Sequence, residues 1–281
     1  MTGAEALRAA IPRLAAAGVP DAPRDARVLL AHGMGIAPDR LTLHLAEPLT
    51  DAAFQAYEAA IIRRAAREPV SHITGQRLFW GRIFRATPDT LDPRPETEIL
   101  VQAALAEPFA RMLDLGTGTG CVLLSCLADR PKATGIGTDI HPATLAVAAA
   151  NAQTHGLSDR ADFALSDWLA QVTGRYDLIV SNPPYIAESE MPALSPEVQR
   201  EPHRALTPGG DGLDAYRAIA NAAPGHLNPG GRLIVETGPT QGAAVTQLFA
   251  AQGLIDIRIL PDLDGRDRVV IARQPGNPAP V

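Results

Sequence analysis

The sequence contains few of the residues that mark several common classes of protein. Its 281 residues include only two cysteines, Cys121 and Cys126, whereas a disulfide-rich secreted domain needs more. Both cysteines lie in an apolar stretch and are interpreted as reduced core residues. No stretch reaches the about 18 uninterrupted apolar residues that span a bilayer. Near the N-terminus, Glu5, Arg8 and Pro12 interrupt the apolar segment that a signal peptide needs. We therefore expect a cytoplasmic protein with no membrane role.

An excess of basic charge is also missing. Residues 1–98 hold 12 basic and 12 acidic side chains, and the remainder holds 13 basic and 19 acidic ones, which gives the net charge of −6. A protein that binds a phosphate backbone over a long footprint normally shows the opposite bias. The charge balance therefore predicts no direct role with nucleic acid. With 46% apolar residues, the chain is globular and long enough for one large or two smaller domains.

The first part of the chain has a helical pattern. Leu7, Ile11 and Leu14 recur at helical spacing, and Thr50 is expected to cap a later helix. Because such short helices bury little surface separately, we predict a small helical bundle over residues 1–74. Residues 75–90 alternate between apolar and polar around Gly81, which predicts a β-hairpin that links the bundle to the rest of the chain.

From Arg111 onward, short apolar runs alternate with helical stretches. Strands are expected at 112–115, 134–139, 162–165, 176–181, 232–236, 255–259 and 268–272, and helices at 121–127, 142–153, 213–221 and 243–251. This alternation predicts an α/β domain with a mostly parallel sheet over residues 91–273. Residues 274–281, which include three prolines, are predicted to form a disordered tail.

The first expected strand leads into a glycine-rich loop with the sequence Gly116-Thr117-Gly118-Thr119-Gly120. In a doubly wound sheet this turn lies at the carboxyl ends of the strands, where ligands bind. The loop lacks the two-residue gap of a dinucleotide fingerprint, and no phosphate-binding lysine follows it. Asp139 ends the next strand, where a carboxylate can accept hydrogen bonds from ribose hydroxyls. The pattern favours a nucleoside cofactor without a pyrophosphate, and a plain tight turn is the alternative.

The most specific motif, Asn182-Pro183-Pro184-Tyr185, directly follows the apolar strand at 176–181. The two prolines remove two backbone donors and leave their carbonyls as acceptors. A planar NH2 group is a poor nucleophile because its lone pair is delocalised. The side-chain oxygen of Asn182 and the carbonyl of Pro183 can each accept one of its N–H bonds, which holds the nitrogen and favours positive charge on it. Tyr185 can form a wall beside the group. The motif predicts methylation of a planar NH2 group, and an asparagine-capped proline turn is the alternative.

Taken together, these segments resemble a known family of enzymes. The glycine loop, Asp139, Ser166-Asp167-Trp168 and Ser181–Ile186 are similar to the class I S-adenosylmethionine-dependent methyltransferases. More narrowly, they resemble the bacterial release factor glutamine methyltransferases, the PrmC/HemK family. Further similar segments are Glu68–Gln76, Phe79-Trp80, Pro93–Glu98, Arg200–Pro202, Ala205-Leu206 and Leu233–Glu236. The first 67 residues agree only in length and helical character. Asp92 departs from the pattern, because an apolar residue is expected there.

The resemblance implies a Rossmann-like class I methyltransferase sheet and S-adenosyl-L-methionine as the methyl donor. It implies that the methionine part of this cofactor is held by Gly116, Thr117, Gly118, Thr119 and Gly120. Asp139 would bind the ribose, and Asp167 and Trp168 would border the adenine. Asn182 would contact both the cofactor and the substrate amide, in a pocket completed by Pro183, Pro184 and Tyr185.

The resemblance also implies the acceptor. In this family it is the glutamine of the Gly-Gly-Gln loop in class 1 peptide chain release factors, and the product is N5-methylglutamine. The N-terminal bundle would dock the release factor. Two other acceptors remain open: a glutamine of ribosomal protein L3, and an adenine N6 amine in nucleic acid, which would call for a positive cleft. A non-catalytic binding module on the same scaffold is a third alternative. With no coiled-coil heptad, a monomer is expected.

Several other polar residues are less informative. His72, His141 and His203 show no metal-ligand spacing, so no metal is predicted. Arg94 is expected either to orient Glu98, to contact the substrate or to form a structural ion pair. Arg200 and Glu201 are candidates for a clamp that holds a loop over the site.

Overall fold

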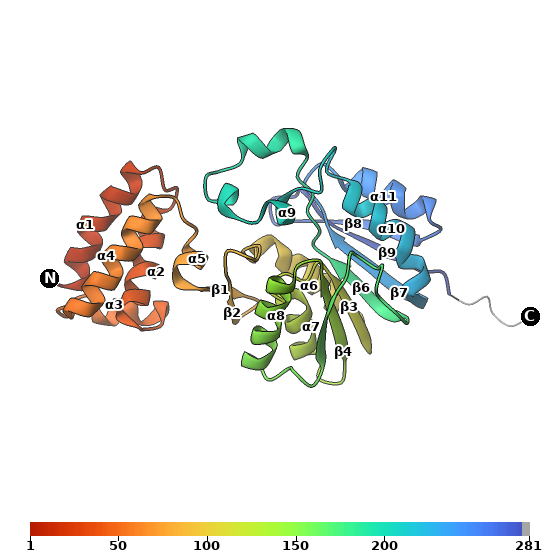
Figure 1. The fold of residues 1–281 in the computed structure, drawn as a ribbon, viewed down its shortest axis with the longest axis horizontal. Coiled ribbons are helices and arrows are strands. Elements are labelled where there is room, and N and C mark those ends of the chain that lie inside the picture. Colours follow the sequence, from red (N-terminus) through yellow and green to blue (C-terminus); the bar gives the residue numbers. More distant parts are fainter. Residues whose placement is uncertain (277–281) are drawn as a thin grey trace, which may run out of the picture. The chain divides into compact units, whose positions relative to one another are not determined.

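The structure, a computed structural model, describes residues 1–276 and contains two compact units. Unit 1 comprises residues 1–76 and 194–200, and unit 2 comprises residues 77–193 and the chain from 201 onward. Unit 1 is helical, and unit 2 contains a seven-stranded sheet with flanking helices (Figure 1). Among the described residues, no helix is both long and apolar enough to cross a membrane.

Side-chain caps mark where the main helices of unit 1 begin. Thr2, Asp21 and Thr50 each accept a hydrogen bond from a backbone N–H in the first turn, so the predicted cap at Thr50 is confirmed. The helices are α1 (Gly3–Ala16), α2 (Ala22–Met34), α3 (Leu41–His44), α4 (Asp51–Ala65) and α5 (Val70–Thr74), with a 3-10 turn η1 (Pro38–Arg40) before α3. Their apolar faces share one core, which includes Leu14, Leu29, Leu30, Tyr57 and Ile61.

A distant segment, residues 194–200, completes unit 1. Its Glu197 forms ion pairs with Arg64 at 2.9 Å and with Arg67 at 2.6 Å. Arg64 is buried and also pairs with Asp25 of α2 at 2.7 Å. Burial would raise the pKa of Glu197, but hydrogen bonds from the two arginines lower it to about 2. Glu197 therefore remains charged at neutral pH, and the network fastens this segment to the helices of unit 1.

The predicted hairpin is present as β1 (Gln76–Phe79) and β2 (Arg82–Arg85). Trp80 and Gly81 have φ angles of +49° and +69°, the pattern of a type I′ turn, which matches the twist of the two strands. The rings of Phe79 and Phe84 meet edge to face at 6.1 Å and lie in a core cluster of unit 2. Apart from its first residues, the segment predicted as a linker is thus part of unit 2.

The sheet of unit 2 has the order β5-β4-β3-β6-β7-β9-β8. Strands β3 to β7 pair in parallel, and β9 is antiparallel to both neighbours, so the predicted α/β fold is confirmed. From β3 the chain first adds β4 and β5 on one side and then crosses to add β6 and β7 on the other side. This reversal places a topological switch point at the carboxyl end of β3. The strands are β3 (Arg111–Leu115), β4 (Thr134–Asp139), β5 (Ala161–Leu165), β6 (Tyr176–Ser181), β7 (Leu227–Glu236), β8 (Ile255–Pro261) and β9 (Asp267–Arg273).

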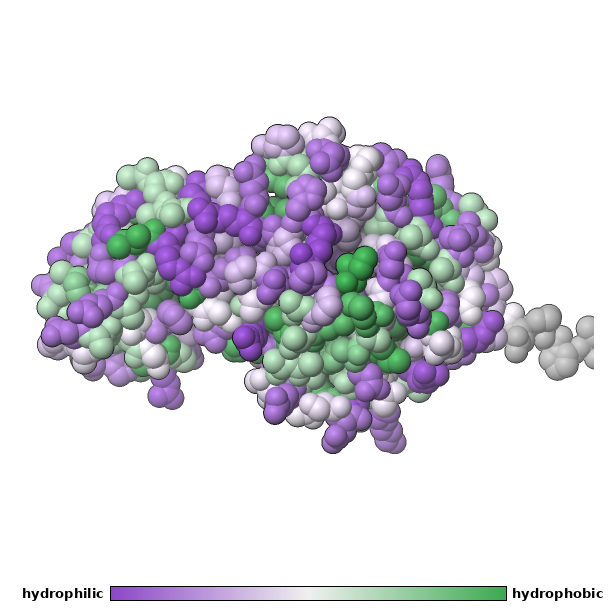
Figure 2. Space-filling model, viewed as in Figure 1, coloured by the Kyte–Doolittle hydropathy of each residue, from purple (hydrophilic) through white to green (hydrophobic). Residues whose placement is uncertain are grey.

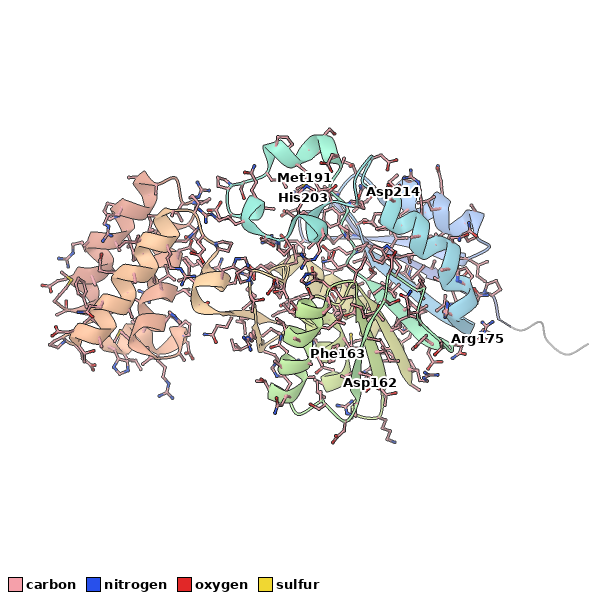
Figure 3. The ribbon with its side chains drawn as sticks, in the orientation of Figure 1. Asp162, Phe163, Arg175, Met191, His203 and Asp214 are labelled. Carbon is pink, nitrogen blue, oxygen red and sulfur yellow. The ribbon has the colours of Figure 1, made fainter. Side chains whose placement is uncertain are left out.

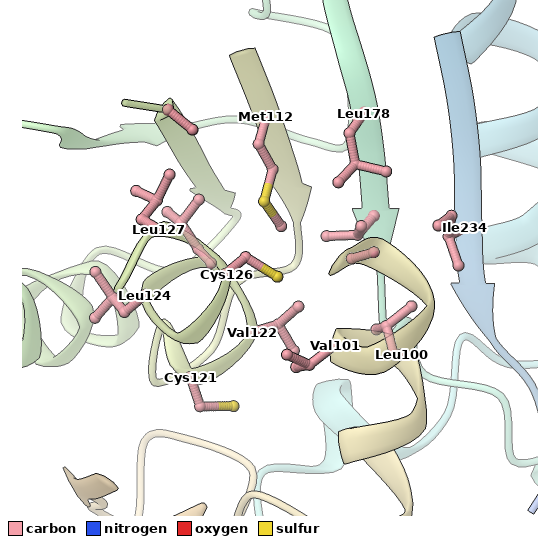
Figure 4. Close-up of a cluster of buried hydrophobic side chains, with 14 of the residues drawn as sticks. Leu100, Val101, Met112, Cys121, Val122, Leu124, Cys126, Leu127, Leu178 and Ile234 are labelled. Atoms are coloured by element: carbon pink, nitrogen blue, oxygen red, sulfur yellow. The ribbon is translucent and has the colours of Figure 1, made fainter. Parts of the chain in front are cut away.

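Helices cover both faces of the sheet because its central strands are apolar on both sides. On one face, Met112, Leu178 and Ile234 of β3, β6 and β7 lie in a cluster with residues of α6 and α7 (Figure 4). Cys121 and Cys126 belong to this cluster and are unpaired and buried, as predicted. On the other face, Tyr216 and Phe249 lie against the sheet. The helices are α6 (Glu98–Leu105), α7 (Cys121–Asp129), α8 (Pro142–Thr154), α9 (His203–Leu206), α10 (Asp214–His226) and α11 (Gly242–Ala251).

The end of the sheet differs in one detail from the expected tail at 274–281. Gln274 donates its backbone N–H to the carbonyl of Gly231 at 2.8 Å and accepts from the N–H of Gly230 at 3.1 Å. Gln274 therefore continues the pairing of the last strand instead of starting a free tail. Residues 277–281 of the predicted tail lie outside the described residues.

Candidate functional site

A cavity of about 360 Å³ lies within unit 2, where the parallel strands end. Its walls come from the loops that follow β3, β4, β5 and β6, from the segment that precedes α6, and from the segment around α9 and the start of α10. Figure 3 labels Asp214, the first residue of α10, which contributes to this last wall. The cavity therefore occupies the place where doubly wound sheets bind ligands.

The glycine loop forms one wall of the cavity. Gly116, Thr117, Gly118 and Thr119 line it, and Gly116 and Gly118 have φ angles of +67° and +56°. A Cβ atom at Gly118 would meet no atom within 4 Å, so it would project into open space at the cavity wall. Gly120 does not line the cavity. It precedes α7, where a Cβ atom would lie 3.1 Å from Leu124 Cδ1, so Gly120 instead allows the loop to turn into the helix.

Two aspartates hold the loop from the sheet side. Asp139 ends β4, and its carboxylate accepts hydrogen bonds from the backbone N–H groups of Gly118 at 3.3 Å and His141 at 3.0 Å. Burial raises the pKa of Asp139, and these two hydrogen bonds oppose the rise. Asp114 is buried and accepts a hydrogen bond from the hydroxyl of Thr117 at 2.7 Å, while burial raises its pKa to about 7. Asp114 therefore holds the loop through the hydroxyl of Thr117, and Asp139 holds it through the backbone N–H of Gly118.

Acidic side chains outnumber basic ones around the cavity. The basic residues at its wall are Arg94 and Arg204, and the acidic residues are Asp89, Asp114, Asp139, Asp167 and Asp214. Asp114 carries only part of a charge near neutral pH because of its raised pKa. Even so, the remaining balance favours a ligand with positive charge, since opposite charges attract strongly in a partly buried site.

The predicted Ser166-Asp167-Trp168 segment lies after β5 and also lines the cavity. Trp168 has a φ angle of +47°, and the hydroxyl of Ser166 donates a hydrogen bond to its carbonyl at 2.8 Å. A Cβ atom at Gly116 would lie 3.8 Å from the Trp168 ring, so the ring stands beside the glycine loop. Asp167 is exposed. The local hydrogen bond holds this turn in a conformation that places an aromatic ring at the cavity wall.

The tetrapeptide lies directly after β6, and its four residues differ in position. Asn182 and Pro184 line the cavity, whereas Pro183 is buried and Tyr185 is half-buried beside it. Asn182 donates a hydrogen bond from Nδ2 to Oγ1 of Thr97 at 3.1 Å. Burial raises the pKa of Tyr185 to about 12, so its phenol is neutral at physiological pH. The structure thus brings Asn182 and the glycine loop to one cavity although they are separated by more than sixty residues.

Asp92, which departs from the family pattern, is buried, and two arginines balance its negative charge. Its carboxylate lies 3.4 Å from Arg77 and 4.0 Å from Arg94, and its backbone N–H donates to Glu201 at 3.2 Å. Arg94 also forms an ion pair with Glu201. Of the alternatives for Arg94, the structural ion pair is observed, and Glu98 instead accepts a hydrogen bond from the backbone of Trp80. These contacts hold Arg94 at the cavity wall.

Some cavity residues were missed from the sequence. Ile140 follows Asp139, lines the cavity and is 60% exposed, which is unusual for isoleucine.

Figure 2 shows hydrophobic residues gathered over the part of unit 2 where α8 and β5 lie, and the exposed Leu165 is on β5. The wall around α9 also includes Arg204 and Thr207, which carry no local signal because only the fold brings them to the cavity; Ala205 of the same wall lies in the Ala205-Leu206 segment already noted in the sequence.

Histidines form no metal site in the described part of the chain. No group of three or more His, Cys, Asp or Glu side chains that could hold a metal ion occurs in residues 1–276. His203 lies on α9 (Figure 3), and its Nε2 is 4.0 Å from the carboxylate of the exposed Glu188. The backbone N–H of His141 donates a hydrogen bond to Asp139.

One buried acid stands close to the tetrapeptide. Ser181 of β6 pairs with Val235 of β7, so Glu236 ends its strand beside Asn182. Glu236 is 1% exposed. Burial raises its pKa to about 7, and a hydrogen bond from Thr97 and the charge of Arg268 oppose the rise. Near neutral pH, protonation of this acid is therefore coupled to folding.

The stability of the wild type is expected to fall with rising pH relative to Glu236→Gln. An acid whose pKa is higher in the folded state binds more protons there, so its contribution is lost as pH rises from the unfolded pKa through the folded one. From about pH 5.5 to about pH 7.5 we expect the wild type to lose about 2 kcal/mol of unfolding free energy relative to the variant. Urea unfolding at both pH values measures this, with Glu190→Gln, an exposed acid, as control. Parallel changes in wild type and Glu236→Gln would contradict the expectation.

Family comparisons cover most of the chain. The family described as PrmC N-terminal domain matches residues 5–75, and the family described as methyltransferase small domain matches residues 89–213. The second match includes the glycine loop, Asp139 and the tetrapeptide. The two matches follow the order of the helical and α/β regions.

Curated relatives align along nearly the whole chain. A release factor glutamine methyltransferase of Cereibacter sphaeroides is 64% identical over 276 residues, which cover 98% of this chain and 99% of the relative. A protein of the same name from Rhodospirillum rubrum is 49% identical, over 93% of this chain and 82% of its own. Among solved structures, a methyltransferase from Pyrococcus furiosus matches with a TM-score of 0.54 and 16% identity, over 78% of this chain and 98% of that chain. This last match supports the fold alone.

Proposed function

Because the chain belongs to the release factor glutamine methyltransferase family, and is therefore a methyltransferase, we propose the following reaction for it. It transfers a methyl group from S-adenosyl-L-methionine to the side-chain amide N5 of the glutamine in the Gly-Gly-Gln motif of class 1 peptide chain release factors. The observation that carries the proposal is the convergence of Asn182 and the glycine loop on one cavity of unit 2. A methyl donor and a planar amide would meet there.

The residues present fit the cofactor. The open space at Gly118 and the acidic wall suit a ligand with a cationic group that approaches the backbone closely. Gly116, Thr117, Gly118 and Thr119 would hold its methionine part, with Gly120 shaping the loop. Asp139 would accept hydrogen bonds from the ribose, and Asp167 and Trp168 would border the adenine. When bound, the cofactor supplies a methyl group on a positively charged sulfur.

The tetrapeptide would prepare the amide for transfer. The side-chain oxygen of Asn182 and the carbonyl of Pro183 would each accept one N–H of the glutamine amide, which fixes the nitrogen and stabilises the positive charge that develops on it. Pro184 and the neutral Tyr185 would enclose the planar group. The methylated amide nitrogen loses a proton readily, so no strong base is needed. The side chains therefore act by positioning and electrostatics.

Unit 1 would supply target recognition by docking the folded release factor. The pocket for the glutamine amide contacts only one side chain of the substrate. Discrimination among proteins therefore needs a second contact surface. We also propose that the enzyme acts as a monomer, in the cytoplasm, with no direct role for nucleic acid or membrane.

Removing residues 1–70 is expected to raise KM for an intact release factor at least about tenfold and to change KM for a short Gly-Gly-Gln peptide less than about threefold. The peptide makes no contact with the helical bundle, so deletion of the bundle should leave its KM nearly unchanged. The control is Glu197→Ala, which breaks the ion pairs that hold residues 194–200 and leaves the pair between Arg64 and Asp25 in place. If the control raises KM as much as the deletion, the effect belongs to that segment and docking by the bundle is contradicted.

The proposed reaction is tested with S-adenosyl-L-methionine labelled in its methyl group. Purified release factor, ribosomal protein L3, total tRNA and DNA are offered as competing acceptors. Label is expected in the release factor and is expected to disappear when its Gly-Gly-Gln glutamine is replaced. Label only in ribosomal protein L3 would keep the chemistry and change the partner. Label only in nucleic acid, as adenine N6 methylation, would overturn the choice of acceptor.

A further inference from the structure

The proposed mechanism needs the side-chain oxygen of Asn182, not its NH2 group, to face the substrate. The two ends of a carboxamide have nearly the same shape, so packing alone distinguishes them poorly. Rotation of Asn182 by half a turn would present two donors to the substrate N–H groups and would abolish the interaction. Something in the protein must therefore fix which end of the side chain points into the cavity.

Thr97 makes the only hydrogen bond to this side chain within the described part of the chain. Nδ2 of Asn182 donates to Oγ1 of Thr97 at 3.1 Å. Thr97 is 2% exposed and lies at the end of the 3-10 turn η2 (Pro95–Thr97). It occupies the N-cap position of α6, yet its side chain makes no capping hydrogen bond. The usual reason for a threonine at this position is absent, and its hydroxyl is directed to other partners.

Glu236 accounts for the direction of this hydrogen bond. Glu236 ends β7, the strand beside β6, and a hydrogen bond from the Thr97 side chain is among the causes that lower the pKa of its carboxyl group. A hydroxyl has one proton to donate. When that proton points to Glu236, only lone pairs remain for Asn182, which must then offer its NH2 group. The amide oxygen is left facing away from Thr97.

Glu236 has no better explanation as a structural ion pair. The charges of Arg268 and Arg94 act on Glu236, but Arg268 pairs with Asp262 at 3.0 Å and Arg94 pairs with Glu201. Among the described residues, Oε2 of Glu236 has no hydrogen-bond partner. A buried acid with so few partners is unfavourable for folding when it is charged, and such acids are typical of groups kept for function.

We propose that Thr97 and Glu236 are positioning residues that hold the Asn182 carboxamide with its oxygen toward the acceptor amide. The proposal rests on the proposed function, because it assigns the orientation on which amide recognition depends. The Thr97 hydroxyl donates to Glu236 and accepts from the NH2 group of Asn182, and neither residue is required to touch the reacting nitrogen.

The test uses the full-length protein with labelled S-adenosyl-L-methionine and an intact release factor. Thr97→Val keeps the shape and removes the hydroxyl, and Thr97→Ser keeps the hydroxyl. We expect Thr97→Val to lower kcat at least about tenfold, with KM for the release factor and Kd for the cofactor within about threefold. Thr97→Ser should recover most of kcat. Glu236→Met, which removes the acceptor and keeps the volume close, should lower kcat in the same way as Thr97→Val.

A second measurement separates positioning from other roles. In an Asn182→Ala background, Thr97→Val should cause no further loss of kcat, because it acts through Asn182. A full additional loss, or a cofactor Kd that rises along with the fall in kcat, would overturn the proposal and make Thr97 a ligand contact. Wild-type kcat in Thr97→Val would overturn it as well. If the wild type methylates no release factor, the proposed function itself is wrong. If the wild type is active and Thr97→Val has the same kcat, only the inference about Thr97 is wrong.

Discussion

Replacing Asn182 with alanine is expected to lower kcat about a hundredfold to a thousandfold, while the cofactor Kd stays within about fivefold. The side-chain oxygen would stabilise charge on the amide nitrogen as the methyl group is transferred, so its loss is felt in the transition state more than in binding. Single-turnover transfer to the release factor gives the rate, and calorimetry gives the cofactor Kd.

The matched control is Asn228→Ala. Asn228 lies at the other end of β7, where its side chain donates to Asp177 at 2.7 Å, away from the cavity. This variant makes the same chemical change and breaks one hydrogen bond, but kcat should stay within about twofold. If Asn182→Ala retains wild-type kcat, the role assigned to the tetrapeptide is wrong, whatever the acceptor.

Placing a side chain at Gly118 is expected to be the most damaging change for cofactor binding. Gly118→Asn should raise the cofactor Kd at least about thirtyfold, or about 2 kcal/mol, because the new side chain would occupy the cavity. Asparagine is chosen because it tolerates a positive φ better than other residues, so backbone strain stays small. Calorimetric titration with S-adenosyl-L-methionine measures the change.

Gly265→Asn separates steric exclusion from backbone strain. Gly265 also has a positive φ, +78°, and open space around it, but it lies in the turn between β8 and β9 and does not line the cavity. Both variants should lower the melting temperature by a similar small amount, and only Gly118→Asn should lose cofactor. Equal cofactor Kd values in the two variants would argue against the loop as the cofactor wall.

The bounds of two strands, β4 and β6, were predicted accurately from the sequence. The bounds of β4 and β6 agree with the prediction, because each run is ended by a strong local signal, Asp139 in one case and Asn182-Pro183 in the other. β7 was predicted to start at Arg232, but it starts at Leu227. Pro229 and Gly230 interrupt the local pattern, and pairing of Leu227 with Tyr176 across an irregular register overrides them. In this part of β7, pairing with β6 outweighs the low strand propensity of Pro229 and Gly230.

Two features could be found only in the folded chain. Residues 194–200 follow the tetrapeptide closely in sequence but join unit 1, where Glu197 contacts Arg64 and Arg67. No periodicity marks this segment, since its stability comes from ion pairs with partners more than 120 residues away. Similarly, Asp92 looks out of place in the sequence and becomes intelligible only beside Arg77 and Arg94.

The sequence by itself determined the alternation of strands and helices, the glycine loop, the carboxylate at Asp139 and the tetrapeptide. Each of these is written in consecutive residues, whose turn geometry and burial follow from local chemistry. Only the tertiary structure decided that Thr97 meets Asn182, 85 residues away, and that Glu236 lies beside both. The reason is physical: strand order and the crossing connections choose which chain segments become neighbours, and a hydrogen bond acts only over a few ångströms.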